Sequence, residues 1–384
     1  MVMAVSRLEQ LIAELCPDGV EYKNLKEICG TITTGKLNAN AMVENGKYAF
    51  FTCDATPFRI DSYAFDTEAI LVSGNGSQVG HINYYKGKFN AYQRTYVLSD
   101  FNYTDVKYLL HYLKGYLRDY IMVHSKKGSV PYITLPMLQN FKIPLPPLAV
   151  QQEIVRILDN FTELTAELTA ELTARRKQYE YYIDRVINAN NYQHIPLNDV
   201  AKVYDGTHQT PNYTESGVKF VSVENINDLY GTTKRISEVD FSKYKIKPQP
   251  GDVFMTRIGD VGTPAVVTTN EPIAYYVSLA LIRPNKELLP QYLYFYIKSS
   301  AFRKELYKRT LHTAVPIKIN KEDIGKCRVA VPPIKEQQRV IALLSRFDTL
   351  CNDISSGLPA EIEARQKQYE YYRDKLLTFK EVTA

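Results

Sequence analysis

The sequence predicts an α+β protein in which two similar globular domains of mixed strands and helices are separated by two long antiparallel coiled-coil helices. Three observations predict this fold class. An amphipathic helix that opens on Pro-Pro occurs twice, within residues 146–190 and 332–384. Each copy follows a block of about 140 residues, which is large enough for its own hydrophobic core. The two blocks show strands and helices in the same order, so the chain has a pseudo-twofold internal repeat.

The repeat aligns individual residues of the two helices. The pairs 186 residues apart are Pro146-Pro147 with Pro332-Pro333, Gln151-Gln152 with Gln337-Gln338, and Phe161 with Phe347. The hexapeptide KQYEYY begins at Lys177 and returns at Lys367, 190 residues later. Two similar helices predict two similar docking surfaces, and two variable blocks predict two recognition units. We therefore expect four segments: a first domain at 1–145, a first spacer helix at 146–190, a second domain at 191–331 and a second spacer helix at 332–384.

The first block opens with a predicted helix at 5–15, where apolar residues recur at helical spacing, and Pro17-Asp18-Gly19 ends it. Short strands separated by Gly and Asn turns come next, for example at 47–53 and 69–76. Residues 104–120 form a predicted helix rich in aromatic residues. A polar loop and a short strand then lead into Pro-Leu-Pro-Pro.

The second block repeats this order. Its opening segment is 195–205, strand-like runs follow at 219–226, 252–259 and 275–284, and a helix is predicted at 291–307. The landmarks that align between the blocks are Val79-Gly80 with Val261-Gly262, Tyr108 with Tyr292, and Val130-Pro131 with Val315-Pro316. The loops differ more than the strands and helices, which is expected of two scaffolds that recognise different targets.

Apolar residues of the repeated helices follow a heptad seam, which predicts a coiled coil. Three tandem Glu-Leu-Thr-Ala units lie at 163–174 in the first helix. The heptad seam resumes there after four extra residues, and such an insertion, called a stutter, unwinds a coiled coil locally. Ser355-Ser356-Gly357-Leu358-Pro359 should break or kink the second helix. The residues expected along the seam or in contact with other subunits are Gln151, Gln152, Phe161, Leu168, Leu172, Tyr179, Tyr182, Gln337, Gln338, Phe347, Ile362, Tyr369 and Tyr372.

Composition narrows the class of protein. The 47 basic and 42 acidic residues give a net charge of +5, which is mildly basic and compatible with nucleic-acid binding. The 5 cysteines are scattered without metal-ligand spacing, as in reduced cytosolic proteins. No apolar run approaches the ~18 residues of a membrane span, and the N-terminus lacks a signal-peptide pattern. We therefore expect a cytoplasmic protein that does not bind a membrane.

The sequence shows no catalytic or metal-binding motif. Gly30 to Leu37 nearly matches a phosphate-binding loop, but Leu37 stands where a magnesium-binding hydroxyl is needed, and no buried strand run leads into Gly30. A GxGxxG fingerprint is missing, and the Pro-Pro segments lack the residues of an amino-methyltransferase catalytic loop. None of the 6 histidines has triad or metal spacing. We predict a non-catalytic recognition subunit.

With its two Pro-Pro openings followed by Gln-Gln, the tandem ELTA units and RQKQYEYYRDKLL at 365–377, the chain resembles the specificity subunit of Type I restriction–modification enzymes over nearly its whole length. The resemblance implies two target recognition domains, each reading one half of a split site in double-stranded DNA. It also implies that the helix pair acts as a ruler and docks two methyltransferase subunits, which bind S-adenosylmethionine and methylate adenine. Motor-nuclease subunits would use ATP and magnesium. No cofactor is expected in this chain.

DNA contacts are predicted on loops from side-chain chemistry. Small residues allow a close approach of the backbone, Asn and Gln pair with adenine, Arg pairs with guanine, and Lys binds phosphate. In the first domain these residues are Ser73, Asn75, Ser77, Gln78, Gln93, Arg94, Lys126, Lys127 and Ser129. In the second domain they are Thr207, His208, Gln209, Arg257, Arg309, His312 and Thr313, with Arg257 as the candidate for guanine.

Three other interpretations stay open at this point. A coiled-coil scaffold with two protein-binding ends predicts no salt-dependent affinity for DNA, whereas DNA binding weakens steeply with salt. A solitary, inactive DNA-binding subunit would lack neighbouring genes for a methyltransferase and a large ATPase. A stand-alone enzyme is disfavoured by the missing motifs.

Overall fold

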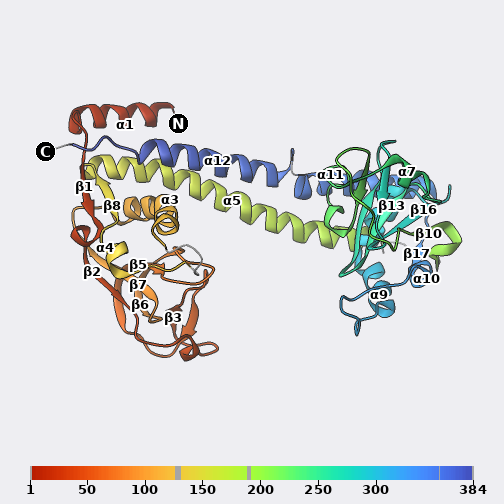
Figure 1. The fold of residues 1–384 in the computed structure, drawn as a ribbon, viewed down its shortest axis with the longest axis horizontal. Helices are drawn as coiled ribbons and strands as arrows, with labels where there is room; N and C mark the ends of the chain where they lie inside the picture. Colours follow the sequence, from red (N-terminus) through yellow and green to blue (C-terminus); the bar gives the residue numbers. More distant parts are fainter. Residues whose placement is uncertain (1, 126–130, 188–191, 354, 383–384) are drawn as a thin grey trace. The chain divides into compact units, whose positions relative to one another are not determined.

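The computed structural model describes residues 2–125, 131–187, 192–353 and 355–382. The chain forms two compact units. The first unit comprises Met1–Leu168 and Glu361–Ala384, and the second unit comprises Thr169–Ala360. Each unit combines sheets with helices (Figure 1), so the predicted α+β class with two similar parts is confirmed.

The first unit is built around a 6-stranded sheet of order β2-β7-β5-β6-β3-β4, in which only β3 and β6 pair in parallel. Buried residues of helix α3, Leu109, Leu113 and Leu117, belong to one core with Ile70 and Leu98 of the sheet. The elements before the sheet are α1 (Val2–Leu15), β1 (Glu21–Asn24) and α2 (Leu25–Ile28). The sheet strands are β2 (Cys29–Thr34), β3 (Tyr48–Phe51), β4 (Phe58–Ile60), β5 (Phe65–Ser73), β6 (Ile82–Ala91) and β7 (Thr95–Phe101). They are followed by α3 (Val106–His124), α4 (Leu135–Gln139) and β8 (Lys142–Leu145), which pairs with β1.

The second unit has a 4-stranded sheet of order β10-β16-β13-β14 and a 3-stranded sheet of order β12-β11-β15. Its strands are β9 (His194–Pro196), β10 (Ala201–Asp205), β11 (Val218–Val221), β12 (Arg235–Ile236), β13 (Val253–Ile258), β14 (Asp260–Val266), β15 (Ile273–Tyr275), β16 (Leu279–Pro284) and β17 (Arg328–Ala330). Its short helices are α6 (Leu197–Val200), α7 (Glu238–Ser242), α8 (Pro290–Lys298), α9 (Ser300–Arg309) and α10 (Lys321–Gly325). Strand β17 pairs with β9, as β8 pairs with β1 in the first unit.

The helix predicted at 291–307 is two helices, and that prediction was wrong in this respect. Ser299 has extended backbone angles, φ −70° and ψ 152°, and its side-chain oxygen accepts a hydrogen bond from the amide of Phe302. A serine that caps the next helix therefore ends α8 and starts α9.

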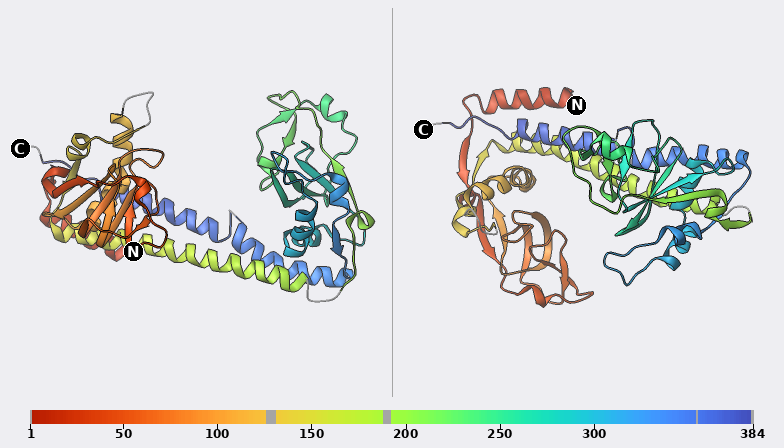
Figure 2. Two further views of the ribbon diagram at one scale, coloured as in Figure 1. Left: turned by 90° about the horizontal axis from the view of Figure 1, so that it is seen from below. Right: turned by 45° about the vertical axis from the view of Figure 1, so that its right-hand side comes forward.

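The long helices pack in an equivalent way in the two units. Helix α5 spans Leu148–Ile187, α11 spans Ile334–Asn352, and α12 spans Leu358–Leu376. In the first unit the Phe161 ring of α5 stacks on Tyr372 of α12 at 5.3 Å, and in the second unit Tyr182 of α5 stacks on Phe347 of α11 at the same distance. In both views of Figure 2, α12 runs beside the first half of α5.

The predicted break in the second spacer helix is confirmed, because α11 ends at Asn352 and α12 begins at Leu358. Gly357 is required in the turn between them, since a Cβ there would lie 2.5 Å from the carbonyl oxygen of Thr349. The side chain of Asp353 accepts hydrogen bonds from Ser355 and Ser356, which closes the turn.

The C-terminal segment returns to the start of the first unit. Glu381 forms a β-bridge with Val20, and the Val20 amide donates to the carbonyl of Lys380 at 2.8 Å. The Tyr22 hydroxyl also donates to the carbonyl of Phe379 at 2.9 Å. Within the described ranges, every helix is too short or too polar to span a lipid bilayer.

Candidate nucleic-acid interface

Four segments of the first unit meet at one end of the strands of its sheet. They are residues 35–38, 73–80, 92–94 and 131–133, and we call them the first loop cluster. Three main-chain hydrogen bonds join them: Gly74 donates to Arg94 at 2.9 Å, Gln93 donates to Leu37 at 2.9 Å, and Ile133 donates to Gly74 at 2.8 Å. Because these bonds use backbone atoms alone, they fix the loops whatever side chains the tips carry.

The first loop cluster exposes several of the residues predicted to contact DNA. Ser77, Gln78, Gln93 and Arg94 are exposed, and Asn75 is half-buried. The thiol of Cys53 donates to Oδ1 of Asn75 at 3.1 Å, which orients that amide. Ser73 is only 2% exposed, so its hydroxyl is not on the surface of the cluster.

A glycine lies at the tip of the longest loop in the cluster. Gly76 has φ +84°, and a Cβ built there would meet nothing within 4 Å. The backbone at this tip is therefore open to a close approach by another molecule. The predicted contacts Lys126, Lys127 and Ser129 lie outside the described residues, and Tyr132 after them forms a β-bridge with Asn75.

The second unit has the same cluster, formed by residues 205–210, 256–262, 276–278 and 309–319. Arg257 donates from its amide to Ser278 at 3.0 Å, Val277 donates to Thr207 at 3.0 Å, and Ile319 donates to Arg257 at 3.0 Å. These bonds are the counterparts of the three in the first unit. Gly259 also matches Gly76, since it has φ +79° and open space around its Cβ.

The correspondence between the clusters shows a loop that the sequence analysis missed. Residues 35–38, part of the near match to a phosphate-binding loop, are the counterpart of 205–210. Strand β2, which contains Gly30 to Thr34, pairs with β7, so these residues are extended and do not wrap the start of a helix. The two glycines could have indicated this loop, because Gly35 and Gly206 both lie where a Cβ would collide with backbone.

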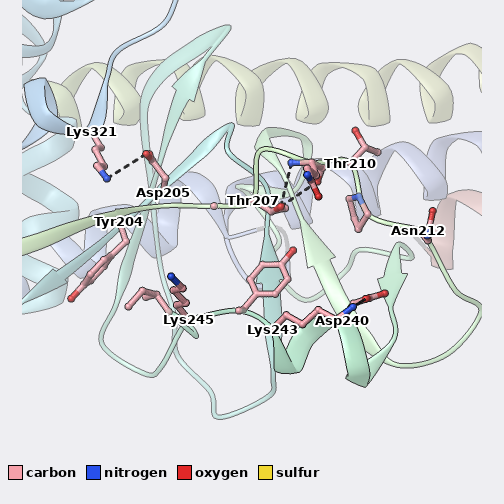
Figure 3. A pocket seen from close by; sticks show the side chains of 14 residues that line it. Tyr204, Asp205, Thr207, Thr210, Asn212, Asp240, Lys243, Lys245 and Lys321 are labelled. Atoms are coloured by element: carbon pink, nitrogen blue, oxygen red, sulfur yellow. Dashed lines mark hydrogen bonds and ion pairs between the residues drawn. The ribbon is translucent and has the colours of Figure 1, made fainter.

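The polar side chains of Asp205, Thr207, Gln209 and Thr210 line a pocket of about 600 Å³. Thr207 is half-buried, and its hydroxyl accepts from the amide of Gln209 at 3.3 Å, whereas His208 and Gln209 are exposed. In the view of Figure 3, Lys243 and Lys245 lie across the pocket from Thr207. Lys243 pairs with Asp240 at 2.7 Å, and Lys245 is exposed and makes no ion pair within the described ranges.

Arg257, the predicted guanine contact, is buried in the second loop cluster. Its guanidinium pairs with Asp205 and donates from Nε to the carbonyl of Ile319 at 3.0 Å. Burial lowers the pKa of this guanidinium from its usual value. Lys321 also lies 3.8 Å from Asp205 (Figure 3). In this structure the Arg257 side chain is almost fully buried and connects two loops.

The remaining predicted contacts lie at the last residue of helix α9 and just after it. Arg309 pairs with Glu305 at 2.8 Å, and the ring of His312 packs on Tyr307 with Nε2 2.9 Å from the Tyr307 carbonyl oxygen. Thr313 is exposed. This segment joins the second loop cluster because the amide of Gly259 donates to Ile317 at 2.8 Å.

Two of the residues predicted for the seam or for subunit contacts are fully buried inside their own units. The Gln151 side chain accepts from the amide of Asp105 at 2.8 Å and donates to the carbonyls of Tyr103 and Pro146. Gln337 accepts from Leu289 at 2.8 Å and donates to Glu287 and Pro332. Each glutamine thus connects the start of a spacer helix to the loop before α3 or α8. Their neighbours Gln152 and Gln338 are exposed.

The other seam residues differ in their burial. Phe161, Tyr179 and Tyr369 are buried, Tyr182 is exposed, and Leu168, Leu172, Phe347, Ile362 and Tyr372 are half-buried.

The equivalent tyrosines Tyr369 and Tyr179 join different polar networks. In the first unit, His111 lies 3.0 Å from the hydroxyl of Tyr369 and 2.9 Å from Asp159, which also pairs with Lys107 at 2.6 Å. Burial is the main reason why the pKa of His111 is lowered.

In the second unit, Tyr179 donates to Asp348 at 2.7 Å, and Asp348 pairs with Lys298 at 2.8 Å. Tyr294 also donates to Asp348, at 3.1 Å. The pKa of this carboxyl is lowered although burial opposes the shift, because Lys298 and its hydrogen-bond donors favour the charged form. Across the described part of the chain, no group of three or more His, Cys, Asp or Glu side chains could hold a metal ion.

Comparison with known proteins gives a consistent result. A family model described as the Type I restriction modification DNA specificity domain matches residues 17–175 and 190–364. A putative type I restriction enzyme specificity subunit of Haemophilus influenzae is 30% identical over 383 residues, which cover 94% of this chain and 96% of that protein. The specificity subunit of the type I restriction enzymes EcoR124I and EcoR124II of Escherichia coli is 33% identical over 306 residues, covering 73% of this chain and 72% of that protein.

Solved structures share the fold. The type I restriction–modification S subunit of M. genitalium superposes with a TM-score of 0.61 at 16% identity, covering 94% of this chain and 96% of that one. A chain from a study of complex assembly and conformational transition of the type I R-M system gives a TM-score of 0.59 at 17% identity, covering 94% and 98%. At these identities the likeness concerns the fold alone.

Proposed function

This chain belongs to the type I restriction–modification DNA specificity family, and from that premise we propose that it reads a DNA site in two parts, one with each loop cluster. Proteins of this family are specificity subunits and are in general not catalytic. The observation that carries the proposal is the duplicated cluster. The same three backbone bonds fix loops with different side chains at their tips, as expected of one scaffold that reads two different sequences.

The chemistry of the tips supports base recognition. Gln78 and Gln93 of the first cluster can each pair with the edge of an adenine, and Arg94 can pair with guanine or phosphate. In the second cluster, Thr207 and Gln209 supply hydroxyl and amide groups in the same pocket as Lys245, which has the chemistry of a phosphate contact, and His208 adds an exposed imidazole. Direct base contacts require such groups, and phosphate contacts set the position of the protein on the duplex.

The spacer helices are the proposed docking surface for two methyltransferase subunits. Tyr181 and Tyr371 occupy the same position in the two copies of KQYEYY, and both are exposed. An exposed tyrosine repeated at equivalent positions offers the same contact twice, which suits two copies of one partner. We place S-adenosylmethionine on those partners, and ATP and magnesium on motor-nuclease subunits that join through them.

A methylome tests this function. The chain would be expressed with its neighbouring methyltransferase subunit in a host free of adenine methylation, and methyladenine would be mapped by long-read sequencing. One split motif, with two short halves around a fixed gap, is the expected result. A soluble complex that leaves the genome unmethylated would contradict the proposal. Binding to duplex DNA at low and high salt would then separate an inactive DNA reader from a protein scaffold.

A further inference from the structure

The segment that follows α9 in the second unit exposes apolar side chains. Val315 is 99% exposed, Leu311 is 41% exposed, and Tyr307 in the last turn of α9 is 70% exposed. Single exposed apolar residues are ordinary, but these three lie within nine positions of one segment, and we call them the apolar patch. The proposed contacts of the loop clusters with bases and phosphates make no use of these side chains.

The backbone under this patch is fixed to the second loop cluster. The amide of Leu311 donates to Lys318 at 2.7 Å, and the amide of Ala314 donates to Leu311 at 3.3 Å. The amide of Gly259, at the tip of the β13–β14 turn, donates to Ile317 at 2.8 Å. Figure 1 shows the segment projecting beyond α9 as a narrow loop. The apolar side chains therefore project from a supported loop on the proposed DNA-reading face.

The charges around the patch favour a polyanion as its occupant. Residues 303–318 contain five basic side chains, Arg303, Lys304, Lys308, Arg309 and Lys318, and one acidic side chain, Glu305. Glu305 pairs with Lys308 at 3.1 Å and with Arg309 at 2.8 Å, while Lys304 and Lys318 are exposed. Apolar side chains with lysines beside them suit a duplex, which offers stacked bases between two rows of phosphates.

The first unit carries a related feature at the equivalent place. The side chain of Ile121 lies against Gly80 as that of Leu306 lies against Gly262, which makes Met122 the counterpart of Tyr307. Met122 is 54% exposed, and Val123 beside it is 79% exposed. Exposed apolar side chains therefore lie in the last turn of the helix next to the loop cluster in both units, α3 in the first and α9 in the second.

We propose that Leu311 and Val315 form an apolar wedge that enters duplex DNA between two neighbouring base pairs of the half-site read by the second unit. Lys304 and Lys318 contact the phosphates on either side. The wedge separates the two stacked bases and bends the duplex, so part of the specificity comes from how easily a step can be opened. This inference rests on the proposed function, because it specifies how the second loop cluster engages DNA.

The test uses the full chain in complex with its methyltransferase subunit. In one set of duplexes with the methylated motif, 2-aminopurine replaces one base at a time across the half-site. In a second set, a donor dye and an acceptor dye label the two ends of the duplex. We expect increased 2-aminopurine fluorescence at one step away from the methylated adenine, together with increased energy transfer. The variant Leu311→Ser/Val315→Ser should lose both signals and bind the specific duplex about tenfold more weakly, with affinity for unrelated DNA unchanged.

The control is Val382→Ser, which removes an exposed apolar side chain from the first unit and should change none of these signals. Unchanged fluorescence and bending in the double variant would overturn the wedge while leaving the two-part motif, and thus the proposed function, intact. Loss of co-purification with a protein partner, with DNA distortion unchanged, would also overturn it and assign the patch to that partner. If the wild-type complex bound no specific duplex, the proposed function itself would fail.

Discussion

The two units use the same frame for their loops but place polar side chains on different loops. In the first cluster the exposed amides are Gln78 and Gln93, on the second and third loops. In the second cluster the counterparts of Gln93 and Arg94 are Val277 and the buried Ser278. Its polar side chains, Thr207 to Gln209, lie on the first loop instead. Under the proposed function, a shared frame therefore does not require a shared reading surface, because the two units carry their recognition chemistry on different loops.

The largest expected effect comes from changing the connection between the units and leaving both clusters intact. Deleting one ELTA unit, residues 167–170, shortens α5 by ~6 Å and rotates the remainder of the helix by about 40°. Since DNA advances ~3.4 Å per base pair, the methylated motif should gain or lose one or two bases in its gap, and methylation of the original motif should disappear. The methylome of the deletion variant measures this.

The control for that deletion is Glu167→Ala, which keeps the helix length and should keep the original gap. If the deletion changed the bases within either half of the motif, the spacer helices would not act as a ruler between two independent readers.

The next largest effect concerns the buried glutamines, which fix equivalent positions in the two units. Gln151→Leu should destabilise the first unit by about 3 kcal/mol, because it leaves the amide of Asp105 and two carbonyl groups without partners. Gln337→Leu should destabilise the second unit by a similar amount. Hydrogen exchange of helices α3 and α8 reports on each unit separately. The exposed neighbours give matched controls, Gln152→Leu and Gln338→Leu, with expected changes of less than about 0.5 kcal/mol. If Gln151→Leu increased hydrogen exchange equally in α3 and α8, the two units would not unfold separately.

A smaller effect is expected from the loop tips, and it should be confined to one half of the motif. Gln93→Ala/Arg94→Ala should cost about 1–3 kcal/mol in binding and relax the sequence at the half read by the first cluster. Thr207→Ala/Gln209→Ala should relax the other half. Methylation frequency at sites with a single mismatch measures both changes. A variant that relaxed both halves together would break the assignment of one half-site to each unit.

The smallest effect distinguishes the polar networks of the two units. The pKa of His111 is lowered from 6.5 in the folded protein, chiefly by burial, so the unfolded state binds a proton more readily. The stability of the first unit should therefore fall as the pH drops below the unfolded pKa of 6.5, and level off below the folded pKa. Asp159 and Tyr369 contact the ring, and Lys107 and Lys114 lie on its own helix. The stability of α3, measured by hydrogen exchange, is therefore expected to fall across this pH window.

The second unit has Phe295 at the position of His111, so α8 should show no change in that pH window. The carboxyl of Asp348 has a lowered pKa, and its contribution to stability is lost only when the pH falls below the usual range of a carboxyl. His111→Phe should abolish the pH dependence of α3 in hydrogen exchange. Persistence of that dependence in the variant would rule out His111 as its source.

The sequence predicted the parts of the fold that depend on local patterns. The two repeated helices and the helix break before Pro359 follow from spacing and backbone chemistry, and the structure contains both. The end of α8 at Ser299 was missed although Ser299-Ser300 is a helix-cap signal, because the aromatic pattern continues through it.

The loop clusters were only partly predictable. Their polar tips were identified from residue type, but residues 35–38 were not, since their place in the cluster depends on a bridge between Leu37 and Tyr92, far apart in sequence. The burial of Arg257 was not predicted for the same reason. Its partner Asp205 is 52 residues away, and only the pairing of β10 and β13 with β16 brings the two together.

The backbone bonds that join the loops also have an evolutionary consequence. Because Gly74–Arg94 and Arg257–Ser278 are connected through main-chain atoms, substitutions of the side chains at the loop tips leave these bonds in place. Under the proposed function, each unit can therefore change the bases that it recognises while the frame that holds its loops, and the other unit, stay the same.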